Sequence, residues 1–271
     1  DDWLQADYQY RQEGFEIKMA RVITIVNQKG GVGKTTTAVN LAAGLAVLEK
    51  KTLLIDLDPQ GNATSGVGID KETVKYQIYD ALIQRVPTKD TIMSTTTENL
   101  YCIPGNIHLT GAEIELVHEF AREHKLKEAL QPILDDFEYI LVDCPPSLGL
   151  LTVNAMTASH DVLVPIQCEY YALEGVSQLL TTIRLIQKNL NPQLNIIGIL
   201  LTMYDKRVNL SNQVAKEVRR YFKEKVFHTI IPRNVKLTEA PSHGKPIFLY
   251  DIKSPGAMNY LHLASEVVER T

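Results

Sequence analysis

The sequence has few of the features that would identify a disulfide-rich, zinc-binding or membrane protein. Its 271 residues include only three cysteines, Cys102, Cys144 and Cys168, which form no C-x-x-C pair and are odd in number. This argues against a disulfide framework or a zinc knuckle and favours buried thiols in a reduced compartment. No apolar run approaches membrane-spanning length, the longest candidates being core strands such as residues 196–201. We therefore expect a cytoplasmic protein without a membrane partner.

The chain also lacks an excess of positive charge. Its formal net charge is -4, so a nucleic-acid partner would have to be bound by a local basic surface. The first 18 residues are polar, contain the only tryptophan and lack the basic start and apolar centre of a signal peptide. We interpret residues 1–18 as an N-terminal extension or a cloning remnant, and residues 19–271 as one domain.

Short β-branched runs alternate with longer amphipathic stretches from Ala20 onward. Strands separated by helix-length connections indicate βαβ units and a mostly parallel sheet. Residues 66–135 have mixed periodicity and are the least well predicted part. The predicted strands are 22–26, 52–56, 139–143, 161–166 and 195–202, and the predicted helices are about 34–48, 149–158, 172–190, 209–225 and from 255 onward.

A glycine-rich loop joins the first strand to the first helix. Its sequence, NQKGGVGKTTT (27–37), approaches the P-loop pattern G-x-x-x-x-G-K-[ST], but Gln28 stands at the first glycine position and a second lysine, Lys29, is present. Gly30, Gly31 and Gly33 would let backbone N–H groups approach a phosphate at the helix N-terminus. Lys34 would reach the β- and γ-phosphates, and the Thr35 hydroxyl would bind Mg²⁺. The predicted fold is a single-domain α/β P-loop NTPase, with a twisted, mostly parallel sheet and helices on both faces.

Carboxylates follow two further strands. Asp143 in DCPPS is at the Walker-B position, where it would hold Mg²⁺ directly or through water. Asp56 and Asp58 in DLDPQGN have period two, so both side chains point to one side. Ligands of open α/β sheets bind at the carboxyl ends of the strands, where a carboxylate can orient water toward a γ-phosphate.

Several blocks together give a specific resemblance. KGGVGKTT, DLDPQGNATSG, DCPPSLGLLT, QCEYYALEG and IPRNVKLTEAPSHGKPI resemble the deviant Walker-A ATPases, and among them the ParA/Soj chromosome- and plasmid-partition proteins. The matching blocks spread over about residues 21–260. The resemblance implies a slow, partner-stimulated ATPase that uses ATP and Mg²⁺.

The resemblance also implies roles for individual residues. Lys29 would reach across a nucleotide-sandwich homodimer to the phosphates bound by the other subunit, which explains the second lysine. Asp58 would position the attacking water, with Asp56 as a less certain second carboxylate at the metal. The implied catalytic residues are thus Lys29, Lys34 and Asp58, and the implied ATP contacts are Lys29, Gly30, Gly31, Val32, Gly33, Lys34, Thr35, Thr36, Pro232 and Asn234.

Residues 203–236 form a basic region, with a local charge of +6 that leaves -10 for the rest of the chain. On the predicted helix, Lys216, Arg219, Arg220 and Lys223 form one stripe, and an apolar stripe of Val214, Val218, Tyr221 and Phe222 should face the core. Such a helix is typical of a surface that binds the phosphate backbone of DNA without contacting the bases. An ordinary solvent-exposed helix of a protein that does not bind DNA can have the same pattern. The resemblance implies non-specific binding of double-stranded DNA by the ATP dimer, a ParB/Spo0J-like partner and association with the nucleoid. It also implies Arg207 and Lys236 as DNA contacts, Lys236 replacing the more usual arginine.

Three other functions remain alternatives. A MinD-like ATPase would end in a basic amphipathic helix that binds the membrane surface. The polar side of the last predicted helix instead carries two acidic residues, Glu266 and Glu269, and one basic residue, Arg270, which argues against membrane binding. A reductase resembling the nitrogenase iron protein would bridge an iron–sulfur cluster through thiolates, for which Cys102 and Cys144 are candidates. A small-molecule kinase or ligase could share the fold.

Overall fold

The fold is built on an eight-stranded sheet whose strands carry long runs of buried side chains. The computed structural model describes residues 19–83, 85–169 and 172–271, so the predicted extension 1–18 lies outside the described residues. Seven strands are parallel and the short edge strand β3 is antiparallel, in the order β3-β4-β2-β5-β1-β6-β7-β8. The strands are β1 (Arg21–Ile25), β2 (Thr52–Asp56), β3 (Met93–Ser94), β4 (Leu100–Ile103), β5 (Tyr139–Asp143), β6 (Asp161–Gln167), β7 (Asn195–Tyr204) and β8 (Val226–Pro232).

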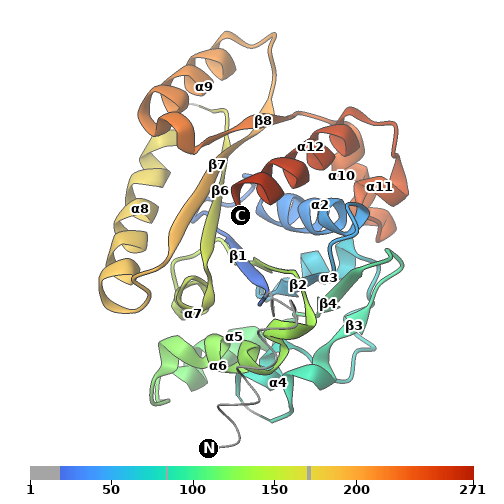
Figure 1. The fold of residues 1–271 in the computed structure, drawn as a ribbon, viewed down its shortest axis with the longest axis vertical. Coiled ribbons are helices and arrows are strands. Elements are labelled where there is room, and N and C mark those ends of the chain that lie inside the picture. Colours follow the sequence, from blue (N-terminus) through green and yellow to red (C-terminus); the bar gives the residue numbers. More distant parts are fainter. Residues whose placement is uncertain (1–18, 84, 170–171) are drawn as a thin grey trace, which may run out of the picture.

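Helices cover both faces of this sheet (Figure 1). One face carries α2 (Lys34–Val47), α10 (Val235–Glu239), α11 (Ile247–Tyr250) and α12 (Pro255–Arg270), with the short α3 (Asn62–Gly66) beside them. The other face carries α4 (Ile78–Leu82), α5 (Leu109–Leu116), α6 (Lys125–Leu130), α7 (Leu150–Ala158), α8 (Ala172–Asn189) and α9 (Asn209–Phe222). The predicted α/β fold is therefore confirmed.

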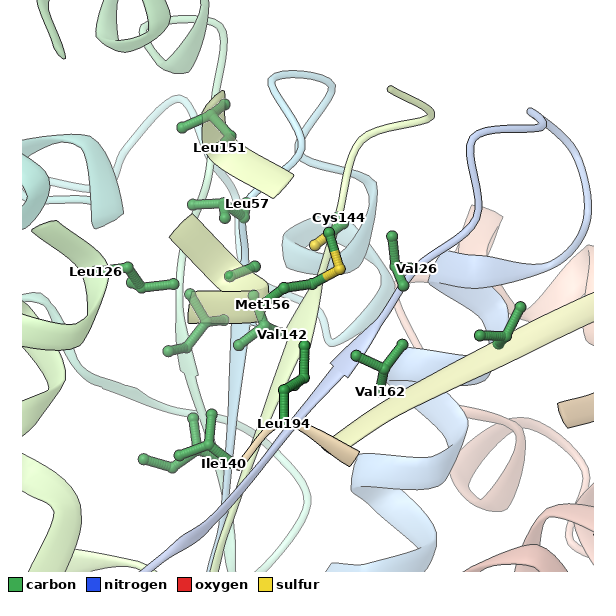
Figure 2. Close-up of a cluster of buried hydrophobic side chains, with 14 of the residues drawn as sticks. Val26, Leu57, Leu126, Ile140, Val142, Cys144, Leu151, Met156, Val162 and Leu194 are labelled. Atoms are coloured by element: carbon green, nitrogen blue, oxygen red, sulfur yellow. The ribbon is translucent and has the colours of Figure 1, made fainter. Parts of the chain in front are cut away.

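Side chains alternate along each strand, so the sheet separates two apolar cores. In β1, Val22 packs toward α5–α9, whereas Ile23 and Ile25 pack toward α2 and α12. Figure 2 shows part of the first core, where the Cys144 sulfur lies among apolar side chains that include Val142 and Met156. Both faces of the sheet are covered by helices, so both sets of strand side chains are buried. This explains why the sequences of the parallel strands are nearly continuous apolar runs.

The predicted elements are recovered with boundary shifts of a few residues. Strand β8 was not predicted, because an edge strand that includes His228 and Thr229 lacks a continuous apolar run. The predicted helical stretch 209–225 consists of α9, which ends at Phe222, and a 3-10 helix over Lys223–Lys225 that begins at a positive φ of 48°. Tyr221 is 65% exposed, so it does not face the core as predicted, whereas Val214 and Val218 are buried and Phe222 packs partly against the core.

The C-terminal helix α12 belongs to the core. Its Tyr260, Leu263 and Val267 are buried, and it packs against α2 and β8. Glu266 accepts hydrogen bonds from the backbone N–H groups of His228 and Thr229. This helix therefore offers no free amphipathic face of the kind that a membrane-surface helix needs. Within the described part of the chain, no helix is long and apolar enough to span a membrane.

Candidate functional site

The glycine-rich loop lies between β1 and α2, near the middle of the sheet. Gly31 and Gly33 have φ values of +73° and +87°, a region that side chains other than glycine rarely adopt. Gly33 is the residue before the helix, and the first turn of α2 contains no acidic residue. The N-terminal N–H groups of α2 and its dipole thus favour a bound anion.

A cavity of about 660 Å³ opens beside this loop. Its lining brings together eight of the ten predicted ATP contacts: Gly30, Gly31, Gly33, Lys34, Thr35, Thr36, Pro232 and Asn234. Asp58 lines it as well. Val32 and Lys29 do not: Val32 is buried and its carbonyl accepts a hydrogen bond from the Thr202 hydroxyl, at 2.8 Å.

Lys34 extends inward along the loop. It is 6% exposed, and its ammonium donates a hydrogen bond to the Lys29 carbonyl oxygen, 3.1 Å away. Burial lowers the pKa of Lys34, while the nearby carboxylates of Asp143 and Asp58 act in the opposite direction. A cation held in this partly desolvated position suits a triphosphate, whose charge would replace the carbonyl as its partner.

Asp143 is the candidate carboxylate for magnesium. It ends β5 and pairs in register with Ile25 of β1 and Asp56 of β2. Both carboxylate oxygens are buried, and neither has a hydrogen-bond partner among the described residues. Burial first, and then the neighbouring Asp56 carboxylate, raise the pKa of Asp143 well above its usual range, whereas the Thr35 hydroxyl and Lys34 oppose this rise.

An unpartnered buried carboxylate near a threonine hydroxyl fits a divalent cation, because the ion would satisfy both oxygens directly or through water. No group of three or more His, Cys, Asp or Glu residues suited to a metal was found in the described ranges. Magnesium would thus be held by Thr35, Asp143 and phosphate oxygens together rather than by a protein cage.

Asp56, the second carboxylate predicted at the metal, has hydrogen-bond partners within the protein. Its Oδ2 accepts hydrogen bonds from the backbone N–H and hydroxyl of Thr64, both at 2.7 Å, and its Oδ1 accepts one from the Asp58 N–H at 3.2 Å. Burial raises the pKa of Asp56 to about 6, although these hydrogen bonds oppose the rise. Asp56 therefore fixes the loop from Asp58 to Thr64, and remains only a predicted metal ligand.

Asp58 is held in the opening of the cavity. It is 7% exposed, and its Oδ1 accepts a hydrogen bond from the Gln60 N–H at 2.9 Å. Its position beside Gly30, Thr35 and Lys34 in one cavity wall suits a carboxylate that orients water toward a terminal phosphate.

Lys29 is not among the residues that line the cavity. Its ammonium lies 3.7 Å from Glu169 Oε2, and its side chain is 38% exposed. The same Glu169 lies 3.9 Å from the Arg233 guanidinium through its other oxygen. The two loop lysines are thus directed to different places.

The lining of the cavity also contains residues that sequence reasoning missed. Met203 and Thr202 of β7, Leu237 and Thr238 of α10, and Tyr260 of α12 all line it. Met203 has a positive φ of 50°, a strained conformation of the kind that collects at functional sites. No local motif identifies these residues, because β7, α10 and α12 meet only in the folded chain. Asn234, which was predicted, also caps α10 by accepting a hydrogen bond from the Lys236 N–H.

The six predicted DNA contacts are all exposed, and three of the four residues of the predicted basic stripe lie on α9. Lys216, Arg219 and Arg220 lie along α9, whereas Lys223 follows the end of the helix. Arg207 pairs with Asp205 through two hydrogen bonds of 2.8 and 3.0 Å. Lys236 is on α10, which packs on the other face of the sheet from α9, and it pairs with Glu239 at 2.9 Å. The segment before α10 is joined to the end of β7 by a hydrogen bond from the Arg233 N–H to the Tyr204 carbonyl.

The thiols are poorly placed to bridge subunits. Cys102 and Cys144 are fully buried and belong to the two different cores, on opposite faces of the sheet. Burial raises the pKa of both thiols well above the usual value. This geometry gives no support to an iron–sulfur cluster.

Comparison with known proteins connects this site to a family. The AAA domain family matches residues 20–196. The sporulation initiation inhibitor protein Soj of Bacillus subtilis is 60% identical over 249 residues, which cover 92% of this chain and 98% of that protein. The chain belongs to the Soj/ParA family of chromosome-partitioning ATPases. The chromosome partitioning protein ParA of Myxococcus xanthus is also similar, with 55% identity that covers 93% of this chain and 89% of that protein.

Solved structures support the fold and the cofactors of this Soj/ParA-family ATPase. A crystal structure described as cobyrinic acid a,c-diamide synthase from Mycobacterium smegmatis, with bound ADP and magnesium, has a TM-score of 0.82 and 38% identity, and the match covers 93% of this chain and 95% of that one. The cell division ATPase MinD of Pyrococcus furiosus has a TM-score of 0.76 and 26% identity, covering 93% and 100% of the two chains. The protein is an ATPase that uses ATP and Mg²⁺, and its much higher identity to Soj and ParA assigns it to the partitioning branch.

Proposed function

We propose that the protein is an ATP-dependent switch that partitions DNA. ATP and Mg²⁺ close a homodimer, the dimer binds double-stranded DNA without sequence specificity and hydrolysis releases it. A ParB/Spo0J-like centromere-binding protein stimulates hydrolysis, and the ATP-bound form is associated with the nucleoid. Residues 19–271 form the ATPase domain, and residues 1–18 lie outside it.

The position of Lys29, partly exposed near Glu169 and not in the lining of the cavity, supports this proposal. A P-loop needs one lysine for its own phosphates, and Lys34 is buried in that position. The Lys29 ammonium instead lies near the exposed carboxylate of Glu169, in a pair that water screens strongly and that a phosphate can outcompete. A fixed cation outside its own cavity is suited to the nucleotide of a second subunit, where it would stabilise charge during phosphoryl transfer.

The exposed cations support the DNA part of the proposal. Lys216, Arg219 and Arg220 of α9 face solvent, and Arg207 is exposed near the start of the same helix. Such cations release counterions when they contact phosphates, which yields salt-dependent binding without base recognition. Lys236 would keep the positive charge of an arginine but could not form the bidentate hydrogen bonds that a guanidinium makes with a phosphate.

Binding of a random-sequence DNA duplex at two salt concentrations tests the switch. The protein should bind with ATP but not with ADP or without nucleotide, and binding should weaken steeply as salt rises. Equal binding in all three states would remove the nucleotide gate. Absence of binding in every state would overturn the DNA proposal.

A further inference from the structure

Asp205 holds Arg207 in a short turn between β7 and α9. The Nε–H and Nη2–H groups of Arg207 donate hydrogen bonds to the two carboxylate oxygens of Asp205, at 3.0 and 2.8 Å. The backbone N–H of Arg207 donates a third hydrogen bond to Asp205 Oδ1, at 3.0 Å. The Val208 N–H donates to the Asp205 carbonyl, which closes the turn, and we call residues 205–208 the Arg207 turn. One carboxylate thus fixes both the backbone and the side chain of the arginine.

Side chains from the first turn of α9 hold the Arg207 turn in place. The hydroxyl of the buried Ser211 accepts a hydrogen bond from the Asp205 N–H, at 3.2 Å. The Asn212 side-chain amide donates to the carbonyl oxygens of Lys206 and Val208, at 3.0 and 3.1 Å. Because the turn is bonded to the helix at several points, it presents its arginine from a fixed backbone.

The two members of the Arg207–Asp205 pair are unequally exposed. The Arg207 side chain is 84% exposed, whereas the Asp205 side chain is only 19% exposed. In the pair between Lys236 and Glu239, by contrast, the cation and the carboxylate are exposed to similar extents. A phosphate that approaches from solvent would therefore meet the Arg207 guanidinium before the carboxylate. This exposure argues against a latch in which Asp205 hides the arginine from DNA.

The pairing also leaves most of the Arg207 donors free. A guanidinium has five N–H groups, and Asp205 takes two of them, so three remain for phosphate oxygens. The hydrogen bonds from Arg207 lower the pKa of Asp205 to about 2, so the carboxylate is ionised and the pair is intact at neutral pH. An arginine already held in one orientation loses less side-chain freedom when it binds a phosphate than a free one does.

We propose that Asp205 is a positioning residue for DNA binding, which orients the Arg207 guanidinium toward a phosphate of the DNA backbone. The gain from this orientation exceeds the repulsion between the Asp205 carboxylate and the phosphate, which the guanidinium and salt both screen. The inference rests on the proposed function, because it concerns the DNA-bound dimer. A surface that attracts DNA by net charge alone would behave in the opposite way, since removal of any acid from it should tighten binding.

The test measures binding of a fluorescein-labelled random-sequence duplex to the full chain with MgATP, by fluorescence anisotropy at two salt concentrations. Asp205→Asn nearly preserves the size of the side chain but removes its charge and one of its two acceptors. It should weaken DNA binding about fivefold, because Arg207 must then be ordered when the DNA binds. The salt slope should equal that of the wild type, because the number of phosphate contacts is the same. The ATP-dependent dimer and basal ATP turnover should not change.

Glu217→Gln is the matched control, because it removes the same charge from the same basic region. Glu217 is exposed on α9, and it forms no ion pair with any residue that the structure describes. This variant should bind DNA as tightly as the wild type or more tightly. The two substitutions make the same change in net charge, so opposite effects on binding would isolate the orientation of Arg207.

Arg207→Ala shows whether Asp205 acts through the arginine. In the Arg207→Ala background, at the lower salt concentration, Asp205→Asn should no longer weaken binding, because no guanidinium is left to orient. Equal weakening with and without Arg207 would overturn the positioning role, as would equal weakening in Glu217→Gln or loss of the dimer in Asp205→Asn.

The remaining outcomes separate this inference from the proposed function. Unchanged or tighter DNA binding in Asp205→Asn, with DNA binding of the wild type intact, would overturn the positioning role and leave the DNA proposal standing. Absence of DNA binding by the wild type in MgATP would overturn both.

Discussion

The Lys34 ammonium donates a hydrogen bond to the backbone carbonyl of Lys29, so the two loop lysines are joined through the loop while their charges are separated. Lys34 is buried beside Asp143 and Asp58, and Lys29 is directed to the rim near Glu169. One loop thus contributes one buried lysine to the lining of its cavity and one partly exposed lysine that is not part of this lining.

Replacing each lysine by alanine should separate nucleotide binding from dimerisation. Lys34→Ala should weaken MgATP binding at least tenfold, because one charge-assisted contact contributes about 1.5–3 kcal/mol. Lys29→Ala should leave MgATP binding to the monomer within about threefold but abolish the ATP-dependent dimer, because its exposed pair contributes little. Calorimetry and light scattering measure the two properties. Equal loss of MgATP affinity in both variants would contradict the division of roles.

Removing the Asp58 carboxylate should slow hydrolysis without loss of ATP binding. A residue that positions the attacking water typically contributes about 10²–10⁴-fold to the rate. Asp58→Ala should therefore hold the ATP dimer for long periods, which is measured by single-turnover hydrolysis and by dimer lifetime. Asp70→Ala is a suitable control, since Asp70 is an exposed aspartate of the following loop. Turnover at the wild-type rate in Asp58→Ala would refute its catalytic role.

Neutralising Asp143 should stabilise the nucleotide-free protein. Its folded-state pKa is raised from 3.8, so between pH 3.8 and that raised value the folded chain binds more protons than the unfolded chain. Stability should accordingly fall as pH rises through this window, and Asp143→Asn should remove that fall. At pH 7.5 we expect a melting temperature higher by about 2–4 °C, the shift that 1 kcal/mol produces in a chain of this size. Stabilisation by MgATP should be lost in the same variant.

Asp161→Asn is the control with the opposite sign. Asp161 is as deeply buried, but it accepts a 2.6 Å hydrogen bond from Arg21 Nε and a 3.0 Å bond from Asn195. Removing its charge should lower the melting temperature, since Arg21 would lose its partner. If both variants shifted stability in the same direction, the unpartnered state of Asp143 would not be the cause.

The DNA proposal predicts different effects for two basic residues of the same region. Arg207→Ala should weaken binding of random-sequence DNA and reduce the salt slope by about 0.9 per lost phosphate contact, with the dimer unchanged. Lys225→Ala should have little effect, because the Lys225 ammonium is bound to the Asn195 side chain and the Ile196 carbonyl, both at 3.0 Å. A loss of dimerisation in Arg207→Ala would mean that Arg207 belongs to the subunit interface.

The sequence by itself determined the parts of this protein that depend on local spacing. The glycine loop, the lysines and threonines around it and the apolar β-branched runs follow from neighbours in the chain, so the phosphate end of the site was predicted residue by residue. Asp58 and Asp143 were also identified, because carboxyl ends of parallel strands share one edge of the sheet.

Only the tertiary structure decided which groups have partners and which do not. The sequence places Asp143 and Asp56 at the ends of two strands but does not show their partners: Thr64 bonds Asp56, whereas neither oxygen of Asp143 has a hydrogen-bond partner among the described residues. The lining of the cavity also includes Met203 of β7 and Tyr260 of α12, which are distant in sequence and come to one cavity only in the folded chain. The exposed apolar side chains of Ile114 and Phe120 were likewise not predicted, because apolar residues in a segment of mixed periodicity do not indicate which of them the sheet will cover.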